Sequence, residues 1–453
     1  MNSPSVSNFI DISHWQLNPY QILTIGYSSV ILLGALLLML PQASKSGLES
    51  LAFIDALFTA TSAVCVTGLI VVDTGNYFSL FGQMVIILLI QIGGLGIMTL
   101  TTLMAIVLGR RIQLSNRLLI QESLNQLTVQ GVVRLVLYIF KVTVLIEFVG
   151  GTILGLRFAV DYGWQGIYYG YWHAVSAFCN AGFDVFGGAT FFRYIEDPIV
   201  NLTIAGLIIL GGIGFAVMAD VWQKRRWRNL TVQSKVVLST TAFLLLLGLF
   251  GILLLEYDNA ATIGSLPLQS KILASFFQSA SARTAGYQMF NNGLLGESSL
   301  LFVVLLMFIG ASPGSTGGGI KTSTFAIIVA SISSMIRGKS EVRLFSRAIE
   351  QQVIIKALSL FFIAATLVFF VTLYLCVTEN LPLIQVVYEV VSAFATVGLS
   401  TGITSSLTVD GKFILIIMML IGRVGVFTFG MALAMRAGKK EDIHHPFGKF
   451  SIG

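Results

Sequence analysis

The strongest constraint on this chain is a short pattern that occurs four times: two residues, a glycine, and a large apolar residue. Successive copies of the glycine are 114, 104 and 112 residues apart. A glycine pair or a single glycine then follows each copy after 25, 29, 24 and 24 residues. Two landmarks that recur in register indicate four copies of one structural unit. The pattern glycines are Gly68, Gly182, Gly286 and Gly398.

Composition places these units in a membrane. Hydrophobic residues make up 55% of the 453 residues and charged residues 11%, whereas soluble domains carry about 25% charged residues. Apolar runs such as 22–40, 243–255 and 358–374 approach the roughly 20 residues that a membrane-spanning helix requires. We therefore expect one transmembrane domain, residues 1–453.

Each repeat divides into a long apolar helix, a shorter half-polar segment that ends at the glycine, and a second long helix. The first helices are expected at 20–40, 135–158, 235–256 and 353–377, and the second at 81–108, 199–222, 299–336 and 413–436. The segments at 48–66, 165–180, 268–284 and 383–396 are too short to span and suit re-entrant hairpins. The prediction is an all-α membrane protein with eight transmembrane helices, four re-entrant pore hairpins and pseudo-fourfold symmetry. Its repeats are approximately 20–111, 134–228, 234–338 and 351–436, followed by a cytoplasmic tail, 437–453.

The charges indicate the orientation. The segments that follow each repeat hold 18 of the 27 basic residues, and the opposite loops are acidic. Cytoplasmic loops collect Lys and Arg, so we expect a multi-pass protein with both termini in the cytoplasm. The basic residues are Arg110, Arg111, Arg117, Arg134, Lys224, Arg225, Arg226, Arg228, Lys235, Arg337, Lys339, Arg343, Arg347, Lys356, Arg436, Lys439, Lys440 and Lys449.

Four glycine loops at one depth favour a pore. Non-helical backbone inside a membrane is tolerated where it is buried or lines a water-filled path. Rings of backbone carbonyls can replace the water shell of an ion, and glycine permits the close approach and positive φ that such loops need. The short helices would direct their partly negative C-terminal ends inward, which favours a cation.

These features resemble the Trk/Ktr/HKT superfamily of potassium transporters, and most closely the membrane subunit of the bacterial Ktr system. The resemblance implies potassium uptake across a bacterial plasma membrane, with sodium activation left open, and no organic cofactor. A glycine in all four loops, including Gly68, implies potassium as the cargo rather than sodium. The implied filter residues are Val66, Thr67, Gly68, Asn180, Ala181, Gly182, Thr284, Ala285, Gly286, Thr396, Val397 and Gly398.

The resemblance also implies a gate inside the third repeat. Pro313 and five glycines interrupt the expected helix at 299–336, and neither residue type sustains a helix. Lys321 and Arg423 are expected to face the same cavity, unless both pair structurally or extend towards the interface. The implied gate residues are Gly310, Ala311, Ser312, Pro313, Gly314, Ser315, Thr316, Gly317, Gly318, Gly319, Lys321 and Arg423.

The expected partners are the lipid bilayer, a second copy of the chain in a homodimer, and a separate ring of cytoplasmic nucleotide-binding regulatory subunits, with no nucleic acid. No His-Glu-x-x-His motif or similar catalytic group occurs in the sequence, so we do not expect an enzyme, nor a metal beyond the transported ion. A sodium- or proton-coupled secondary transporter, or a sodium-selective relative, remains an alternative. Glu147 would then be a relay, although a carboxylate there also suits pairing between helices.

Overall fold

The computed structural model describes residues 19–47, 50–107, 121 and 131–426. Several predicted features lie outside these residues: the ends of the first and fourth repeats, the tail at 437–453, and seven of the basic residues. These seven are Arg110, Arg111, Arg117, Arg436, Lys439, Lys440 and Lys449.

Each repeat contains a long first helix, followed by a short helix that ends at the glycine loop, where the sequence predicts them. The helix after the loop is called the second helix below. The long helices are α1 (Pro19–Leu38), α7 (Val132–Tyr162), α11 (Val232–Glu256) and α15 (Gln351–Thr378). The short helices are α2 (Phe53–Val64), α8 (Trp164–Phe178), α12 (Leu268–Ser281) and α16 (Leu383–Phe394). Brief turns of helix lie between the main elements: η2 (Pro41–Ala43), α3 (Thr74–Tyr77), η3 (Gly188–Tyr194), η4 (Trp227–Asn229), η5 (Asn292–Leu294) and η6 (Thr404–Ser406).

The helix that follows the glycine loop begins after a capping polar side chain in three of the four repeats. Ser79, Asp197 and Thr408 accept hydrogen bonds from backbone N–H groups in the first turns of α4, α9 and α17, and such caps satisfy donors that the helix leaves unpaired. These helices are α4 (Leu80–Leu95), α9 (Pro198–Ile213), α13 (Glu297–Phe308) and α17 (Val409–Val424).

Two of these helices, α4 and α9, are followed by a sharp bend, which corrects the expectation of continuous helices at 81–108 and 199–222. The chain bends by 94° between α4 and α5 (Ile97–Val107) and by 95° between α9 and α10 (Phe215–Lys224). Gly96 and Gly214 occupy the two bends with φ of +82° and +99°, a conformation that ends a helix. In the third repeat the predicted interruption separates α13 from α14 (Thr322–Ile336).

Length and apolarity make four of the described helices capable of crossing a membrane, or six if each bent pair counts as one span. The other second helices, α13 and α17, have 12 and 16 residues. The mainly helical architecture is confirmed, and the count of eight crossings stays a prediction. A two-residue hairpin, β1 (Arg343–Leu344) with β2 (Arg347–Ala348), departs from the all-helical expectation.

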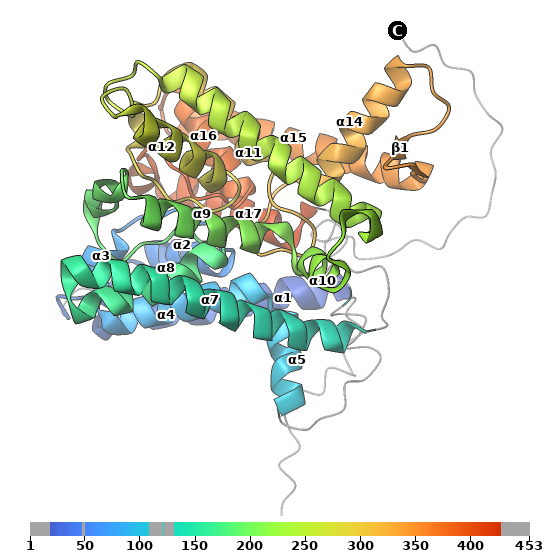
Figure 1. Ribbon diagram of the computed structural model, residues 1–453. Coiled ribbons are helices and arrows are strands. Elements are labelled where there is room, and N and C mark those ends of the chain that lie inside the picture. Colours follow the sequence, from blue (N-terminus) through green and yellow to red (C-terminus); the bar gives the residue numbers. More distant parts are fainter. Residues whose placement is uncertain (1–18, 48–49, 108–120, 122–130, 427–453) are drawn as a thin grey trace, which may run out of the picture.

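The repeats form a closed ring. The second helix of each repeat contacts the short helix of the next one, in the pairs α4–α8, α9–α12, α13–α16 and α17–α2. The last pair joins the fourth repeat to the first, and a salt bridge of 2.7 Å between Lys412 and Asp55 links the same two helices. Figure 1 shows α7 and α11 along the outside of the molecule with α9 between them.

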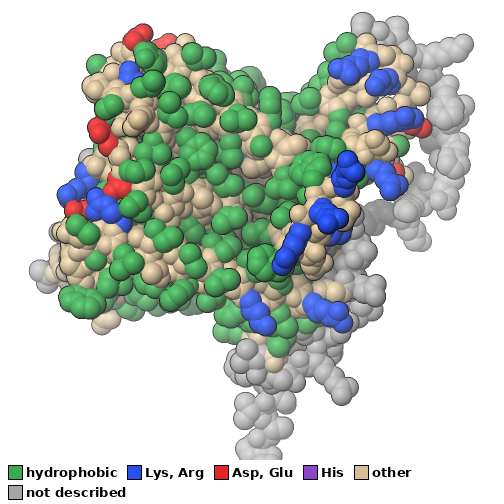
Figure 2. Space-filling model, in the orientation of Figure 1, with side chains coloured by type: hydrophobic (Ala, Val, Ile, Leu, Met, Phe, Trp, Pro, Cys, Tyr) green, Lys and Arg blue, Asp and Glu red, His purple; other side chains and the backbone are tan. Residues whose placement is uncertain are grey.

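The surface matches a membrane environment. The long helices expose large apolar side chains, including Leu145 at 61%, Leu254 at 77% and Phe369 at 63%. Figure 2 shows many Lys and Arg side chains and few acidic ones over α10, α14 and β1 at one end. Most acidic residues in this view lie at the opposite end, beside a smaller number of basic ones. The apolar band between the two ends is where the bilayer would lie.

Candidate ion-conducting site

The four pattern glycines encircle one axis. A Cβ atom added to Gly68 would collide with the carbonyl oxygen of Ala181, and one added to Gly182 would collide with that of Ala285. The relation continues in order around the ring, from Gly286 to Val397 and from Gly398 back to Thr67. Each glycine has a positive φ, between +69° and +93°. No other residue type would allow the loops to approach this closely.

Hydrogen bonds in the first and fourth loops show which way the carbonyls point. The N–H groups of Gly68 and Gly398 donate to the hydroxyls of Ser62 and Ser392, each at 3.0 Å. These serines lie near the ends of the short helices α2 and α16. Because a trans peptide directs its N–H and C=O in opposite directions, the carbonyls before each glycine face away from the short helices and into the ring.

In the second and third loops the serine hydroxyls bond to a different partner. The hydroxyl of Ser176 donates to the Phe183 carbonyl at 2.9 Å, and the Gly286 N–H donates to the Ser281 carbonyl at 3.3 Å. The hydroxyl of Ser281 also donates to the Tyr287 carbonyl at 2.6 Å. Six residues before the glycine, three repeats have a serine and the third repeat has Ala280. In the third loop the structure uses the adjacent Ser281 instead.

A strained residue stands two positions before each glycine. Val66, Asn180, Thr284 and Thr396 all have positive φ, between +51° and +70°, which is uncommon for residues other than glycine. All four side chains are fully buried. Such strain persists only where the surrounding contacts impose it, so the loops are held rigidly in one conformation.

The interrupted segment of the third repeat packs against the second helix of repeat two. The N–H groups of Ser312 and Thr316 donate to the carbonyls of Gly212 and Gly211 at 3.0 and 3.2 Å. The Phe215 N–H donates to the Gly314 carbonyl at 3.0 Å. The loop therefore fills the break between α9 and α10, and its own backbone satisfies groups that the break exposes.

The same loop touches three of the four glycine loops. The hydroxyl of Thr316 lies 3.2 Å from the side-chain amide of Asn180, and the Gly318 N–H donates to the Thr396 hydroxyl at 3.0 Å. A Cβ on Gly317 would collide with the hydroxyl of Thr284. The loop thus lies against one side of the ring and contacts three of its four loops.

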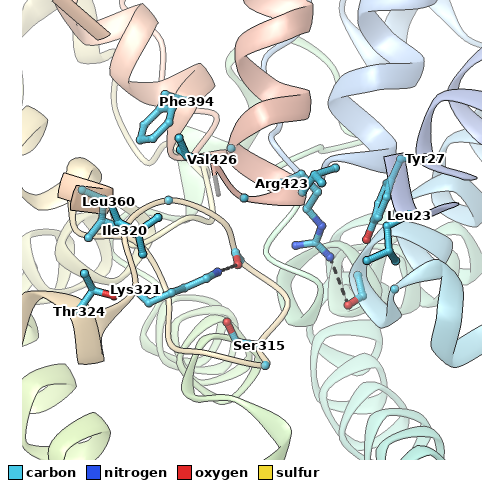
Figure 3. Close-up of a pocket in the computed structure, with 18 of the residues that line it drawn as sticks. Leu23, Tyr27, Ser315, Ile320, Lys321, Thr324, Leu360, Phe394, Arg423 and Val426 are labelled. Atoms are coloured by element: carbon cyan, nitrogen blue, oxygen red, sulfur yellow. Dashed lines mark hydrogen bonds between the residues drawn. The ribbon is translucent and has the colours of Figure 1, made fainter. Parts of the chain in front are cut away.

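Arg423 and Lys321 fasten this loop. The Arg423 guanidinium donates to the carbonyls of Thr316 in the loop and Gly93 at the end of α4. The Lys321 ammonium donates to the Gly317 carbonyl at 2.8 Å. Figure 3 shows both side chains reaching into one cavity from opposite sides. The structure therefore brings these two predicted gate residues together with the loop.

Other polar groups brace the site. The carboxylate of Glu147 on α7 accepts a hydrogen bond from the Gln91 amide on α4 at 3.4 Å. The sequence left two roles open for Glu147, an ion relay and pairing between helices, and this bond is such a pairing. Glu389 on α16 accepts from the hydroxyls of Ser400, at 2.9 Å, and Thr404. Ser400 lies two residues after Gly398, so Glu389 supports the outer side of the fourth loop.

Comparison with known proteins shows the family. The family model described as TrkH, cation transport protein, matches residues 16–442. The chain belongs to this family. Its members are described as transport proteins rather than enzymes. The curated relatives include a Ktr system potassium uptake protein B from Bacillus subtilis, 43% identical over 97% of both chains. Another is the potassium/sodium uptake protein NtpJ of Enterococcus hirae, 40% identical over 94% of this chain and 95% of the relative.

A solved structure shares the fold. The crystal structure of the potassium transporter TrkH from Vibrio parahaemolyticus matches with a TM-score of 0.70, covering 93% of this chain and 86% of that one at 17% identity. The shared architecture supports the placement of helices in this family member. The assignment of individual residues comes from the contacts described above.

Proposed function

We propose that the chain carries potassium into a bacterial cell through the ring formed by its four glycine loops. The observation that carries this proposal is the unbroken cycle in which each glycine abuts the carbonyl of the next loop. Inward carbonyls supply the oxygen ligands that a dehydrated potassium ion needs. The similarity to named potassium uptake proteins at 39–43% identity supports the same cargo.

The filter would consist of three residues in each loop, ending at Gly68, Gly182, Gly286 and Gly398. The segment 310–319 with Lys321 and Arg423 would be the gate, because it contacts three of the four glycine loops and is fastened on both sides. Sodium ions would activate potassium uptake through this pathway. The TrkH fold suits a plasma-membrane location, and the basic end of Figure 2 would face the cytoplasm with both termini.

The proposal keeps the four repeats, 20–111, 134–228, 234–338 and 351–436, as one transmembrane domain with eight crossings. It also keeps a homodimer and a ring of nucleotide-binding subunits at the cytoplasmic face. The exposed basic residues of β1 and β2, Arg343 and Arg347, offer that ring a positively charged surface. Purification of lone monomers whose flux no added subunit changes would contradict both partners.

Substitution of Gly68 by Ser tests the filter directly. The new side chain would press on the Ala181 carbonyl, so the ring should open and discriminate less against the more strongly hydrated sodium ion. We expect the ratio of potassium to sodium uptake to fall on the order of tenfold, equivalent to about 1.4 kcal/mol. The matched control is Gly206→Ser on α9, where an added Cβ meets open space. An unchanged ratio in Gly68→Ser would remove Gly68 from the filter.

Flux in proteoliposomes separates a conducting pore from a coupled transporter. Purified protein should admit potassium when only a membrane potential is imposed, and the rate should follow that potential. Uptake that requires an imposed sodium or proton gradient, at a constant ratio of ions, would instead support a symporter. Replacement of Glu147 by Gln should then abolish the coupling, whereas the pore proposal expects only weaker packing between α4 and α7.

A further inference from the structure

A cavity of about 240 Å³ lies between the gate loop and the inner end of the molecule. Three cationic residues line it: Lys321 at the end of the loop, Arg423 on α17 and Lys356 on α15. Among the described residues that line the cavity, none is Asp or Glu. A potassium ion that leaves the ring would therefore enter a positively charged space, which opposes its passage.

Two of the three cationic groups are directed into this space. Figure 3 shows the Lys321 side chain and the Arg423 guanidinium extending from opposite walls, with Tyr27 of α1 and Leu360 of α15 at the two flanks. An ammonium has three donors, and the Lys321 Nζ donates to the Gly317 carbonyl. The arrangement suits a further acceptor group that carries negative charge.

A groove on the outer face of α15 continues from the cavity. Lys356 and Leu360 line both the cavity and the groove. The rest of the groove is formed by one further turn on either side, and its accessible surface is almost wholly apolar. Ile355 and Ile363 in the groove are 55% and 50% exposed, as expected where a helix faces lipid. The remaining groove residues are Gln352 and Ser359.

We propose that an anionic phospholipid of the inner leaflet binds here, with its phosphate at Lys356 and Lys321 and one acyl chain along α15. Basic pockets between membrane helices on the cytoplasmic side suit such headgroups, and the adjoining apolar groove suits an acyl chain. The orientation in the membrane rests on the proposed function. The bound phosphate neutralises positive charge on the route from the gate to the cytoplasm, so this lipid promotes potassium flux.

Lipid retention by the full-length protein tests the site without any ion flux. The protein is exchanged into nanodiscs that contain phosphatidylcholine with about 20% phosphatidylglycerol. It is then extracted and assayed for co-purifying lipid by native mass spectrometry. We expect phosphatidylglycerol to be enriched in the wild type. Lys356→Gln should lower its retention about fivefold by removing a charge, and Ser359→Trp should do so by filling the groove.

The matched control is Lys339→Gln, which removes a charge from the same end of the molecule, away from the cavity. Equal retention of both lipids by the wild type, or unchanged retention in both cavity variants, would overturn the proposal. Displacement of the lipid by millimolar inorganic phosphate would identify a free anion as the ligand instead. A disulfide between two Ser359→Cys chains, made in a Cys376→Ser background, would identify the groove as a contact between copies.

Potassium flux in vesicles gives the functional readout. The wild-type rate should rise about threefold when phosphatidylglycerol replaces a fifth of the phosphatidylcholine, and this response should be lost in Ser359→Trp, which leaves all three cationic residues in place. Equal rates in both membranes would overturn the regulatory effect. The lipid-retention assay tests the lipid site, and the variant Gly68→Ser tests the proposed filter. A negative result for the lipid site would therefore leave the proposed potassium pathway untouched.

Discussion

At the scale of single residues, Arg283 distinguishes the third loop from the others. It follows α12, is 6% exposed, and its guanidinium donates to the Thr241 carbonyl at 3.4 Å. Within the described residues its Nε and the Thr241 hydroxyl have no partner. The corresponding positions before the other three glycines hold Cys65, Cys179 and Ala395. A buried cation behind one side of the ring opposes the binding of another cation.

Replacement of Arg283 by Met should strengthen potassium binding. Methionine retains the length of the side chain and removes the charge, which would favour an ion in the ring by about 1 kcal/mol. The KM for potassium should then fall about fivefold, as the concentration dependence of uptake would show. Arg337→Met, at the exposed end of α14, serves as the control. A KM equal to that of the wild type would mean that the charge does not reach the ring.

Asp184 should make uptake depend on the external pH. It lies two residues after Gly182, and its carboxylate accepts from the Phe186 and Gly187 N–H groups at 3.2 and 3.4 Å. Burial raises the pKa of Asp184 to about 6; the nearby carboxylate of Asp73 adds to the rise, and the two amides oppose it. The negative charge at this outer side is therefore present above about pH 6 and is lost below it.

Uptake at low potassium should fall about threefold as the external pH drops from 7 to 5, because fewer cations are attracted to the outer side. Asp184→Asn should show the low rate and no step near pH 6. The comparison needs initial rates at fixed internal pH, with a pH-independent ionophore to set the membrane potential. A step that persists in Asp184→Asn would assign it to another group.

At the scale of elements, the second helices break at equivalent points by two different means. Gly96, Gly214 and Gly425 end their helices with nearly the same backbone angles, φ of +82° to +99° and ψ near +135°. In the third repeat the break is expanded into the segment 309–321, which pairs with itself through Ile309 and Ile320. The segment proposed as the gate is therefore an enlarged form of the break that Gly96 and Gly214 make in the first two repeats.

Shortening the segment Ser312–Gly319 should raise potassium flux. The deletion removes the bonds to Asn180 and Thr396 and clears the inner side of the ring, so the rate should increase at least several-fold, by analogy with removal of a closed lid. The control is a deletion in the exposed hairpin of β1 and β2, which lies away from the ring. A deletion variant that keeps its thermal transition yet transports no faster would show that the segment does not obstruct the pathway.

At the scale of the whole molecule, the charge distribution predicts the topology. A cysteine introduced at Lys339 or Arg228, in a chain whose Cys376 is replaced by Ser and whose other two cysteines are buried, should react with a membrane-impermeant reagent only after cells are opened. A cysteine at Asn291 or Asp258, at the opposite end, should react in intact cells. The physical reason is that translocation of Lys and Arg is unfavourable. Labelling of both ends in intact cells would contradict the assigned orientation.

Much of this architecture was accessible from the sequence. The recurring glycine pattern predicted the four short helices and placed a loop at each glycine, because periodic apolar runs and glycines act locally on the backbone. Apolar length likewise predicted α1, α7, α11 and α15, and Pro313 with its neighbouring glycines predicted the interruption of the third repeat.

Only tertiary structure decided how the pieces combine. The loop of the third repeat fills the bend at Gly214, and the third repeat uses Ser281 in place of a serine at position 280. The cycle of glycines against carbonyls and the bonds from Arg423 to two distant repeats join residues more than 100 positions apart. Sequence periodicity reflects local backbone preference. These contacts instead depend on how four units pack about one axis, so the tertiary structure was needed to identify them.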